Sequence, residues 1–438
     1  MLLPRSLLEL RAALRAGSID PEHVVRASLA SVAMTNPRLG AFVDVHEQEA
    51  IHAARLFKEA GVAGNGPLAG IPVAVKDNIA EAGVVCAAGS NAYADRVAPA
   101  DAEVVRRLRK AGAVILGRTA MDELGDHTTG ETCLKGPVHN PWRHGYRAGG
   151  SSAGSAAAVC AGLAAAALGT DTAGSSRIPA ALCGVVGFKP SFGLLPVEGI
   201  VPLSPSLDHV GIIARSVPDV AAVLDALVPK GYLDACLRWA GRLRIGILRP
   251  WTEEPEDEVM QVIGEALPLF EKAGFVLQDA ACEGLQGARR TMGKVYRPEA
   301  VKVHAATLQE RPDAFGALVR ADLERGLRQT EAEYQEGLRE REEIRKAVLA
   351  VSETFDILVS PTTPHRARPV GSEGATALLT YTVPFNLTGQ PALTLPVGLH
   401  DGLPVGLQLV GRLGEETRLL AVAAALERRL GFSGAVPE

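Results

Sequence analysis

The sequence of 438 residues predicts a layered α/β fold with a largely buried β-sheet. Three times along the chain, at 101–117, 256–280 and 320–360, a helical pattern leads into a short apolar run. A fourth apolar run, 71–75, is bounded by glycine and proline before it and by polar residues after it, as buried strands are. With 47% hydrophobic residues the chain can bury a large core, and nothing in its composition forces a domain boundary.

The N-terminal segment is predicted to be helical. Leu7, Leu10 and Leu14 recur at the spacing of one helix face. Asp20 followed by Pro21 predicts the start of a second helix, because aspartate caps free N–H groups and proline fits the first turn. The strand at 71–75 then runs directly into three polar residues that begin with Lys76.

The later elements follow the same reasoning. Asp101 is predicted to cap a helix that precedes a strand at 113–117. The alanine-rich run 155–167 is expected to be helical throughout. The segment 319–347, rich in Glu and Arg, is predicted to form a solvated helical hairpin ahead of a strand at 356–360.

Composition excludes several classes of function. A net charge of -5 provides no basic stripe, so we expect no direct contact with nucleic acid. The six cysteines include no C-x-x-C pair and are expected to be buried thiols rather than disulfides. The N-terminus carries charges through its apolar part, and the apolar run 156–169 is short for a membrane span. The expectation is a cytoplasmic protein that does not contact membranes.

The stretch AGGSSAGSAA, residues 148–157, contains a match to the pattern G-x-S-x-G with Ser152 at its centre. That pattern marks a nucleophile only where a strand runs into the turn, and the preceding residues 139–150 contain no apolar strand. The local alternative is a helix N-terminus, where glycine supplies a flexible backbone and serine a capping hydroxyl. Local evidence alone favours the helix start.

A second serine loop, TDTAGSSRIP, lies between apolar segments. Gly174 beside Ser175 allows backbone N–H groups to turn inward, which is what an oxyanion hole requires. A serine nucleophile also needs a base. Lys76 is one candidate, because burial would lower the pKa of its amine, and a solvated strand-end lysine is the alternative. The residues His127, Cys133, His139 and His144 fit no compact ligand motif, so we expect neither a metal nor a cofactor.

Several blocks together resemble the amidase signature family over most of the chain. They are GPLAGIPVAVKDNI, GRTAMDEL, GGSSAGSAAAV, ALGTDTAGSSRIPAALCGVVGFKPSFG, PLSPSLDHVG and PFNLTGQPALTLPVG with its following GLPVGLQLVGR. The resemblance implies a three-layer α/β/α fold around a large mixed sheet, in a single domain covering 1–438. Its parts would be N-terminal helices at about 1–60, a signature core at about 66–215, and the remaining sheet, outer helices and C-terminal segment at about 216–438.

The resemblance also implies a Ser–cis-Ser–Lys triad. Lys76 would be the base, Ser151 the relay in a cis peptide linkage, and Ser175 the nucleophile. The family pattern places the oxyanion hole at the backbone N–H groups of Thr172, Ala173, Gly174 and Ser175. It gives supporting roles to Ser152, Asp171 and Arg177.

The implied function is hydrolysis of a small carboxylic amide to a carboxylate and ammonia or an amine, through an acyl-enzyme on Ser175. One alternative is the A subunit of a glutamyl-tRNA amidotransferase, which is the glutaminase component of that enzyme. Two others are an inactive binding relative and an allophanate-hydrolase-like enzyme. The last shares the variant turn T-A-G-S, residues 172–175, with Ala173 in place of a glycine. A homodimer is left open. In relatives the loop containing Asp126, His127 and Thr128 lies near the acyl site, which makes these residues candidates for substrate contact.

Overall fold

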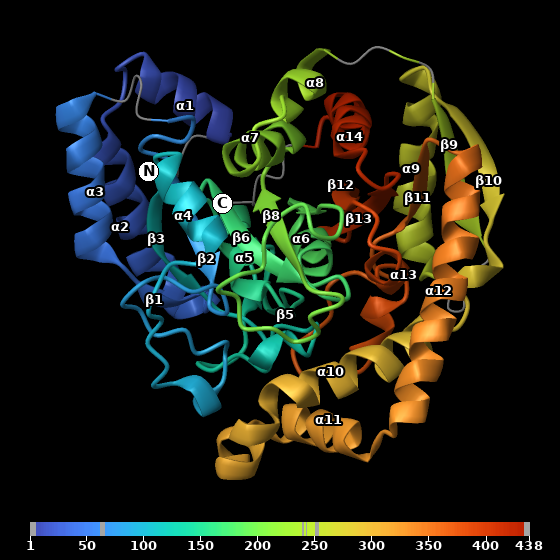
Figure 1. Cartoon of the computed structure of the whole chain (residues 1–438). Helices are drawn as coiled ribbons and strands as arrows, with labels where there is room; N and C mark the ends of the chain where they lie inside the picture. Colours follow the sequence, from blue (N-terminus) through green and yellow to red (C-terminus); the bar gives the residue numbers. More distant parts are fainter. Residues whose placement is uncertain (1–5, 62–65, 239–240, 242, 250–253, 433–438) are drawn as a thin grey trace.

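The computed structural model describes residues 6–61, 66–238, 241, 243–249 and 254–432. Their main element is an 11-stranded mixed sheet with helices on both faces (Figure 1), in the order β1-β3-β2-β6-β8-β7-β12-β13-β11-β9-β10. This confirms the three-layer α/β/α prediction. The large sheet consists of β1 (Phe42–Val45), β2 (Pro72–Lys76), β3 (Val114–Thr119), β6 (Ala166–Asp171), β7 (Val186–Lys189), β8 (His209–Ala214), β9 (Arg244–Arg249), β10 (Val276–Ala281), β11 (Ile357–Pro361), β12 (Ala392–His400) and β13 (Leu403–Val410). A separate pair is formed by β4 (His139–Asn140) and β5 (Arg143–Arg147).

The helices vary widely in length. The α-helices are α1 (Leu7–Arg15), α2 (Pro21–Leu39), α3 (Glu47–Ala60), α4 (Glu103–Lys110), α5 (Ala153–Cys160), α6 (Arg177–Cys183), α7 (Val217–Leu227), α8 (Tyr232–Arg238), α9 (Asp257–Lys272), α10 (Ala288–Glu310), α11 (Ala317–Arg328), α12 (Glu331–Thr354), α13 (Val383–Leu387) and α14 (Glu416–Leu430). Short 3-10 helices are η1 (Asn91–Tyr93), η2 (Glu123–Gly125), η3 (Glu283–Leu285), η4 (Pro312–Ala314) and η5 (Thr376–Leu379).

Helices cover both faces of the sheet, and successive residues of a strand point to opposite faces. In β2, Val73 and Val75 pack in one core cluster with α1, α4, α7, α9 and α14. Ala74, between them, packs in a second cluster with α2, α3 and α5. The apolar run at 71–75 is therefore continuous because both of its faces are covered.

The sheet topology brings the two predicted catalytic segments to one edge. β2 pairs in parallel with β6, with Val75 opposite Leu168. The carboxyl ends of parallel neighbours lie at the same sheet edge. Lys76 at the end of β2 and Asp171 at the end of β6 therefore lie close together, and the serine turn follows directly.

Most local predictions are confirmed, and two differ. Asp20 caps α2, accepting a hydrogen bond from the Glu22 N–H at 2.7 Å. Asp101 does not cap α4, since its carboxylate accepts the Ala82 N–H at 2.8 Å and the cap residue is Ala102. The alanine-rich helix ends at Cys160, and residues 166–171 form β6. The turn between them contains a glycine with φ +70, a conformation that interrupts a helix.

Three further expectations can be compared with the structure. The segment rich in Glu and Arg contains two helices, α11 and α12, as predicted. All six cysteines are free and buried. Within the described part of the chain, no helix is both long and apolar enough to cross a membrane.

Candidate active site

Lys76 lies fully buried at the end of β2. Its Nζ is 2.7 Å from the Ser151 Oγ and 2.8 Å from the Thr170 Oγ1, to which Asn78 Nδ2 also donates at 3.1 Å. Burial lowers the pKa of the Lys76 amine to about 7. The alternative of a solvated strand-end lysine is therefore wrong. A buried amine with this pKa is partly neutral near pH 7 and can accept a proton from a neighbouring hydroxyl.

The first serine loop is fixed by its backbone. The Gly150–Ser151 peptide bond is cis, and the Ser151 carbonyl accepts the Asp122 N–H at 3.1 Å. Gly150 lies so close to Asp122 that a Cβ there would be 1.9 Å from the Asp122 Oδ2, which leaves room only for glycine. Ser151 is 1% exposed, and Lys76 is the only hydrogen-bond partner of its Oγ among the described residues.

Ser152 connects the two serine loops instead of facing a substrate. Its Oγ donates to the Thr170 carbonyl at 3.1 Å, and its N–H donates to the Ser175 carbonyl at 3.0 Å. Because the Ser152 hydroxyl is buried and already bonded, the G-x-S-x-G match does not mark an available nucleophile. These contacts fit the supporting role expected for this residue.

The second serine loop turns around Asp171. The two oxygens of its carboxylate accept the Gly174 N–H at 2.8 Å and the Ser176 N–H at 3.2 Å. Arg177 meets the same carboxylate with two nitrogens, at 2.9 and 3.0 Å. Although burial alone would raise it, the Arg177 guanidinium holds the pKa of Asp171 below its usual value. The turn that presents Ser175 is thus closed by a buried ion pair.

Residues from the C-terminal third complete this ion pair, and no role for them was predicted from the sequence. Arg177 also donates to the Asn386 Oδ1 and the Gln408 Oε1, both at 2.6 Å, and to the Thr382 carbonyl at 3.2 Å. Asn386 returns a bond to Asp171 at 2.9 Å. The available signal was a polar residue inside each of two apolar blocks, PFNLTGQP and GLQLVGR.

The predicted oxyanion donors divide into two groups. The N–H groups of Thr172, Ala173 and Ser175 donate to no other group in the described ranges. The Gly174 N–H differs from the expectation, because the Asp171 carboxylate already accepts it. Three of the four predicted donors therefore remain available for a developing oxyanion. Ser175 itself is 3% exposed, and its hydroxyl is committed to no other described residue.

A second carboxylate supports the start of the same turn. The Thr172 hydroxyl donates to the Asp208 Oδ1 at 2.6 Å, and the other Asp208 oxygen accepts the N–H groups of Leu203 and Ser204. Burial raises the pKa of Asp208 to about 6. Asp208 lies in the block PLSPSLDHVG, so its position in the sequence was noticed and its contact was not.

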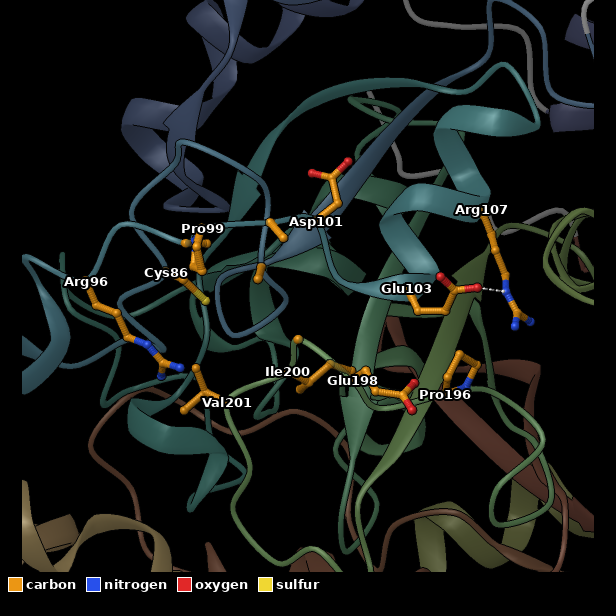
Figure 2. A pocket seen from close by; sticks show the side chains of 14 residues that line it. Cys86, Arg96, Pro99, Asp101, Glu103, Arg107, Pro196, Glu198, Ile200 and Val201 are labelled. Atoms are coloured by element: carbon orange, nitrogen blue, oxygen red, sulfur yellow. Dashed lines mark hydrogen bonds and ion pairs between the residues drawn. The ribbon is translucent and has the colours of Figure 1, made fainter.

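Two large cavities open on the described surface. The larger, of about 840 Å³, is bordered by neither of the two catalytic serine candidates nor by Lys76 (Figure 2). Figure 2 shows Glu103 and Arg107 pointing toward each other at its side. The Arg107 Nε lies 2.7 Å from the Glu103 Oε1, so these charges are already paired. The second cavity, of about 640 Å³, is bordered by Asp126, His127 and Thr128 together with parts of α10, α11 and residues 375–383.

The four metal-ligand candidates judged in the sequence do not come together. His139 and His144 pack against each other with ring centroids 4.2 Å apart and ring planes tilted by 46°, Cys133 is buried beside the Gly130 carbonyl, and His127 borders the second cavity. The expectation that all four are loop residues is wrong for His139 and His144, which lie in the paired strands β4 and β5.

Comparison with known proteins gives consistent results. A family model described as Amidase matches residues 23–420. The chain is 36% identical over 458 residues to the A subunit of the glutamyl-tRNA(Gln) amidotransferase of Thermus thermophilus, covering 96% of each. A crystal structure of an amidase superposes with a TM-score of 0.92 at 36% identity, covering 97% of this chain and 100% of that one. The A subunit of the Thermotoga maritima glutamyl-tRNA(Gln) amidotransferase superposes at 0.81 with 28% identity, covering 95% and 94%.

Proposed function

This chain belongs to the amidase signature family of hydrolases that act on amide C–N bonds, and we propose that it is a stand-alone amidase working through a Ser175 acyl-enzyme. The observation that carries the proposal is the buried contact of 2.7 Å between the Lys76 Nζ and the Ser151 Oγ. The lowered pKa of this lysine, about 7, supports its role as the base.

The first half of the reaction forms the acyl-enzyme. Neutral Lys76 takes the proton of Ser151 as Ser151 takes the proton of Ser175, and the Ser175 Oγ bonds to the amide carbon. The N–H groups of Thr172, Ala173 and Ser175 stabilise the resulting oxyanion. The C–N bond then breaks, and the proton held by Lys76 passes through Ser151 to the leaving nitrogen.

The second half restores the enzyme. Water attacks the acyl carbon and gives up a proton along the same route, and the carboxylate product leaves as Ser175 regains its hydrogen. Asp171 and Arg177 remain charged throughout and hold the turn.

The sheet that runs from Phe42 to Val410 supports treating residues 1–438 as a single domain.

A second candidate function is that of a glutaminase component within an amidotransferase. The sequence similarity to such components, 34 to 36% identity, favours it. The superpositions favour a stand-alone amidase, with a TM-score of 0.92 for an amidase and 0.81 for an amidotransferase component. An allophanate-hydrolase-like activity is the third candidate.

The test is to purify the chain alone and measure ammonia release from aliphatic, aryl and amino-acid amides, glutamine and allophanate. We expect hydrolysis of at least one simple amide without any added protein. Release from glutamine that appears only after a second amidotransferase component is added would reject the stand-alone assignment. Hydrolysis confined to allophanate would replace it with the third candidate.

A further inference from the structure

Asp126 has a buried carboxylate that accepts no hydrogen bond from the described residues. Its side chain is 4% exposed, and neither of its oxygens has a hydrogen-bond partner among the described residues. The His127 Nε2, 4.0 Å from the Asp126 Oδ2, has none either. The Tyr296 hydroxyl adjoins the carboxylate without meeting hydrogen-bond geometry. Buried polar groups are almost always bonded, so an unsatisfied carboxylate beside a cavity points to a ligand.

Two segments that border the cavity beside Asp126 also reach the serine loops of the proposed reaction centre. Gly125, the preceding residue, is so placed that a Cβ there would lie 3.4 Å from the Ser151 Oγ. In the other segment the Thr382 hydroxyl donates to the Ala173 carbonyl at 2.6 Å, and Leu379, Thr380 and Val383 border the cavity. An amide at Ser175 could therefore extend into this space of about 640 Å³.

Other charged groups that border the cavity are already paired. Asp322 accepts hydrogen bonds from Arg325 at 2.8 Å and from Arg297 at 3.3 Å. Lys294 forms ion pairs with two glutamates of α12, at 2.7 and 3.1 Å. Asp126 is the carboxylate of the cavity that lacks a hydrogen-bonded cation, so one further positive charge would complete it.

Of the remaining basic groups, the His127 ring comes nearest, with its Nε2 4.0 Å from the Asp126 Oδ2, which is beyond hydrogen-bond distance. Arg290 is exposed, and half-buried Arg289 reaches toward the Thr380 hydroxyl at 3.4 Å. Burial, and then the Asp126 carboxylate, raise the pKa of the Tyr296 phenol well above its usual value, so it stays neutral. A neutral hydroxyl cannot compensate the Asp126 charge.

We infer that the substrate is an amide whose acyl part carries a protonated amine, and that Asp126 binds this ammonium group while the scissile carbonyl lies at Ser175. The inference rests on the proposed function. An ammonium group supplies one positive charge and several donors, which matches one carboxylate with two unsatisfied oxygens.

A divalent metal ion is the competing ligand. Ligand atoms of Asp126, His127 and Asp322 lie within 4.8 Å of one another. Asp322 is already shared by Arg297 and Arg325, however, and two guanidinium groups beside the site would repel a doubly charged ion. The cavity is also far larger than an ion requires. A singly charged organic group fits both observations better.

The test compares matched substrates on the purified chain. Alkanamides are paired with ω-amino alkanamides in which an ammonium replaces the terminal methyl, for example heptanamide with 6-aminohexanamide, across several chain lengths. For at least one length we expect kcat/KM to favour the ammonium substrate by about tenfold to a hundredfold, the range for a hydrogen-bonded buried charge. Asp126→Asn should reduce this ratio toward one. Asp313→Asn, the same charge change at a residue 97% exposed, should leave the ratio unchanged.

The pH dependence of the ratio separates charge pairing from shape. The groups facing Asp126 are His127, Tyr296, Arg297 and Asp322. Burial raises the pKa of Asp126 to about 6, so the preference should disappear as the pH falls below about 6. A melting temperature for Asp126→Asn no lower than that of the wild type would show that the variant is folded.

The outcomes distinguish the inference from the function it rests on. Failure of the wild type to hydrolyse any amide would reject the proposed function. Hydrolysis of both series with equal kcat/KM at every length would reject the ammonium inference alone. So would thermal stabilisation of the wild type, but not of Asp126→Asn, by Mg²⁺, Mn²⁺ or Zn²⁺ added alone, because a metal would then occupy Asp126.

Discussion

At the scale of single residues, the site depends on one lysine that is fully buried and still reactive. Burial lowers the pKa of Lys76, and the nearby carboxylates Asp122, Asp171 and Asp208 limit the fall. The result, about 7, leaves the amine able to gain and lose a proton in the neutral range. Asp171 stays ionised because Arg177 compensates it.

The lysine makes the rate depend on pH. Only the neutral amine can accept the Ser151 proton, so kcat/KM should fall about tenfold per pH unit below the Lys76 pKa of about 7 and level off above it. Lys76→Met should reduce kcat by about a thousandfold or more, because the serine then lacks a base. Steady-state rates between pH 5 and 9 measure both effects. A wild-type profile that is flat across pH 6 to 8 would contradict the role of Lys76.

The ion pair under the serine turn should be costly to break. Arg177→Met leaves the Asp171 carboxylate buried without its cation, so we expect a loss of about 3–5 kcal/mol in unfolding free energy. Urea denaturation measures this loss. Arg238→Met, at a side chain 79% exposed, is the control and should change stability little. Equal effects of the two substitutions would contradict the account of the turn.

The site could be predicted from sequence only in part at this scale. Lys76, Ser151 and Ser175 lie in dense local patterns, and the structure brings the first two into contact. Asn386 and Gln408 are distant along the chain, and their local signal, a polar residue in an apolar block, does not reveal which residue they contact. The hydrogen bond from the Gly174 N–H to the Asp171 carboxylate could not be predicted either, since it depends on the direction of the Asp171 side chain.

At the scale of elements, the turn between β6 and α6 leaves no room for a side chain at its glycine. Gly174 has φ +128, and a Cβ there would lie 2.3 Å from the Thr382 Oγ1. The backbone of the neighbouring Ala173 is held by the same hydroxyl at 2.6 Å. The position of the Ser175 nucleophile is thus coupled to the segment before α13.

Gly174→Ala should therefore lower kcat strongly while changing the melting temperature little. The added methyl group pushes the turn away from Thr382 and misplaces the oxyanion donors, for which we expect a loss of about a hundredfold. Gly193→Ala is the matched control, since it also has positive φ but a Cβ there would meet nothing within 4 Å. Kinetics and melting curves of both variants give the comparison. Wild-type kcat in Gly174→Ala would reject the coupling.

Elements were predicted well where a periodic pattern continued and less well where tertiary contacts decided. The strand at β2 and the helix at α2 follow from local residues alone. Asp101 looked like a helix cap, but the Ala82 N–H competes for its carboxylate. The alanines after Cys160 carry no preference strong enough to distinguish helix from strand, and pairing with β2 and β8 decides for strand.

At the scale of the whole molecule, the packing of the layers buries several ionisable groups whose charge opposes folding. Glu427 of α14 accepts the Val217 N–H of α7 with both oxygens, at 3.0 and 3.1 Å. Burial raises the pKa of Glu427 to about 8.

The fold class itself was predictable from the sequence, because burial on both faces produces continuous apolar strands. The order of the 11 strands was not predictable, since it depends on long-range pairing.

Glu427 should make stability fall with rising pH. Its folded pKa lies above its unfolded value of 4.5, so the folded state binds the extra proton between these values and loses that advantage as the pH approaches 8. Glu427→Gln should raise the free energy of unfolding at pH 8 by about 1–2 kcal/mol, less than the full shift because the side chain keeps some solvent contact. At pH 4.5 the two proteins should be equally stable. A variant less stable at pH 8 would contradict this assignment.

The most direct test of the central claim is to identify the residue that becomes acylated. The wild type and the variants Ser175→Ala and Ser152→Ala are treated with a slowly hydrolysed activated ester or a fluorophosphonate, and the modified peptide is mapped by mass spectrometry. We predict one adduct on Ser175 in the wild type and in Ser152→Ala, and none in Ser175→Ala, whose amide hydrolysis should fall by about a thousandfold or more. An adduct on Ser152, or amidase activity that survives in Ser175→Ala, would contradict the mechanism.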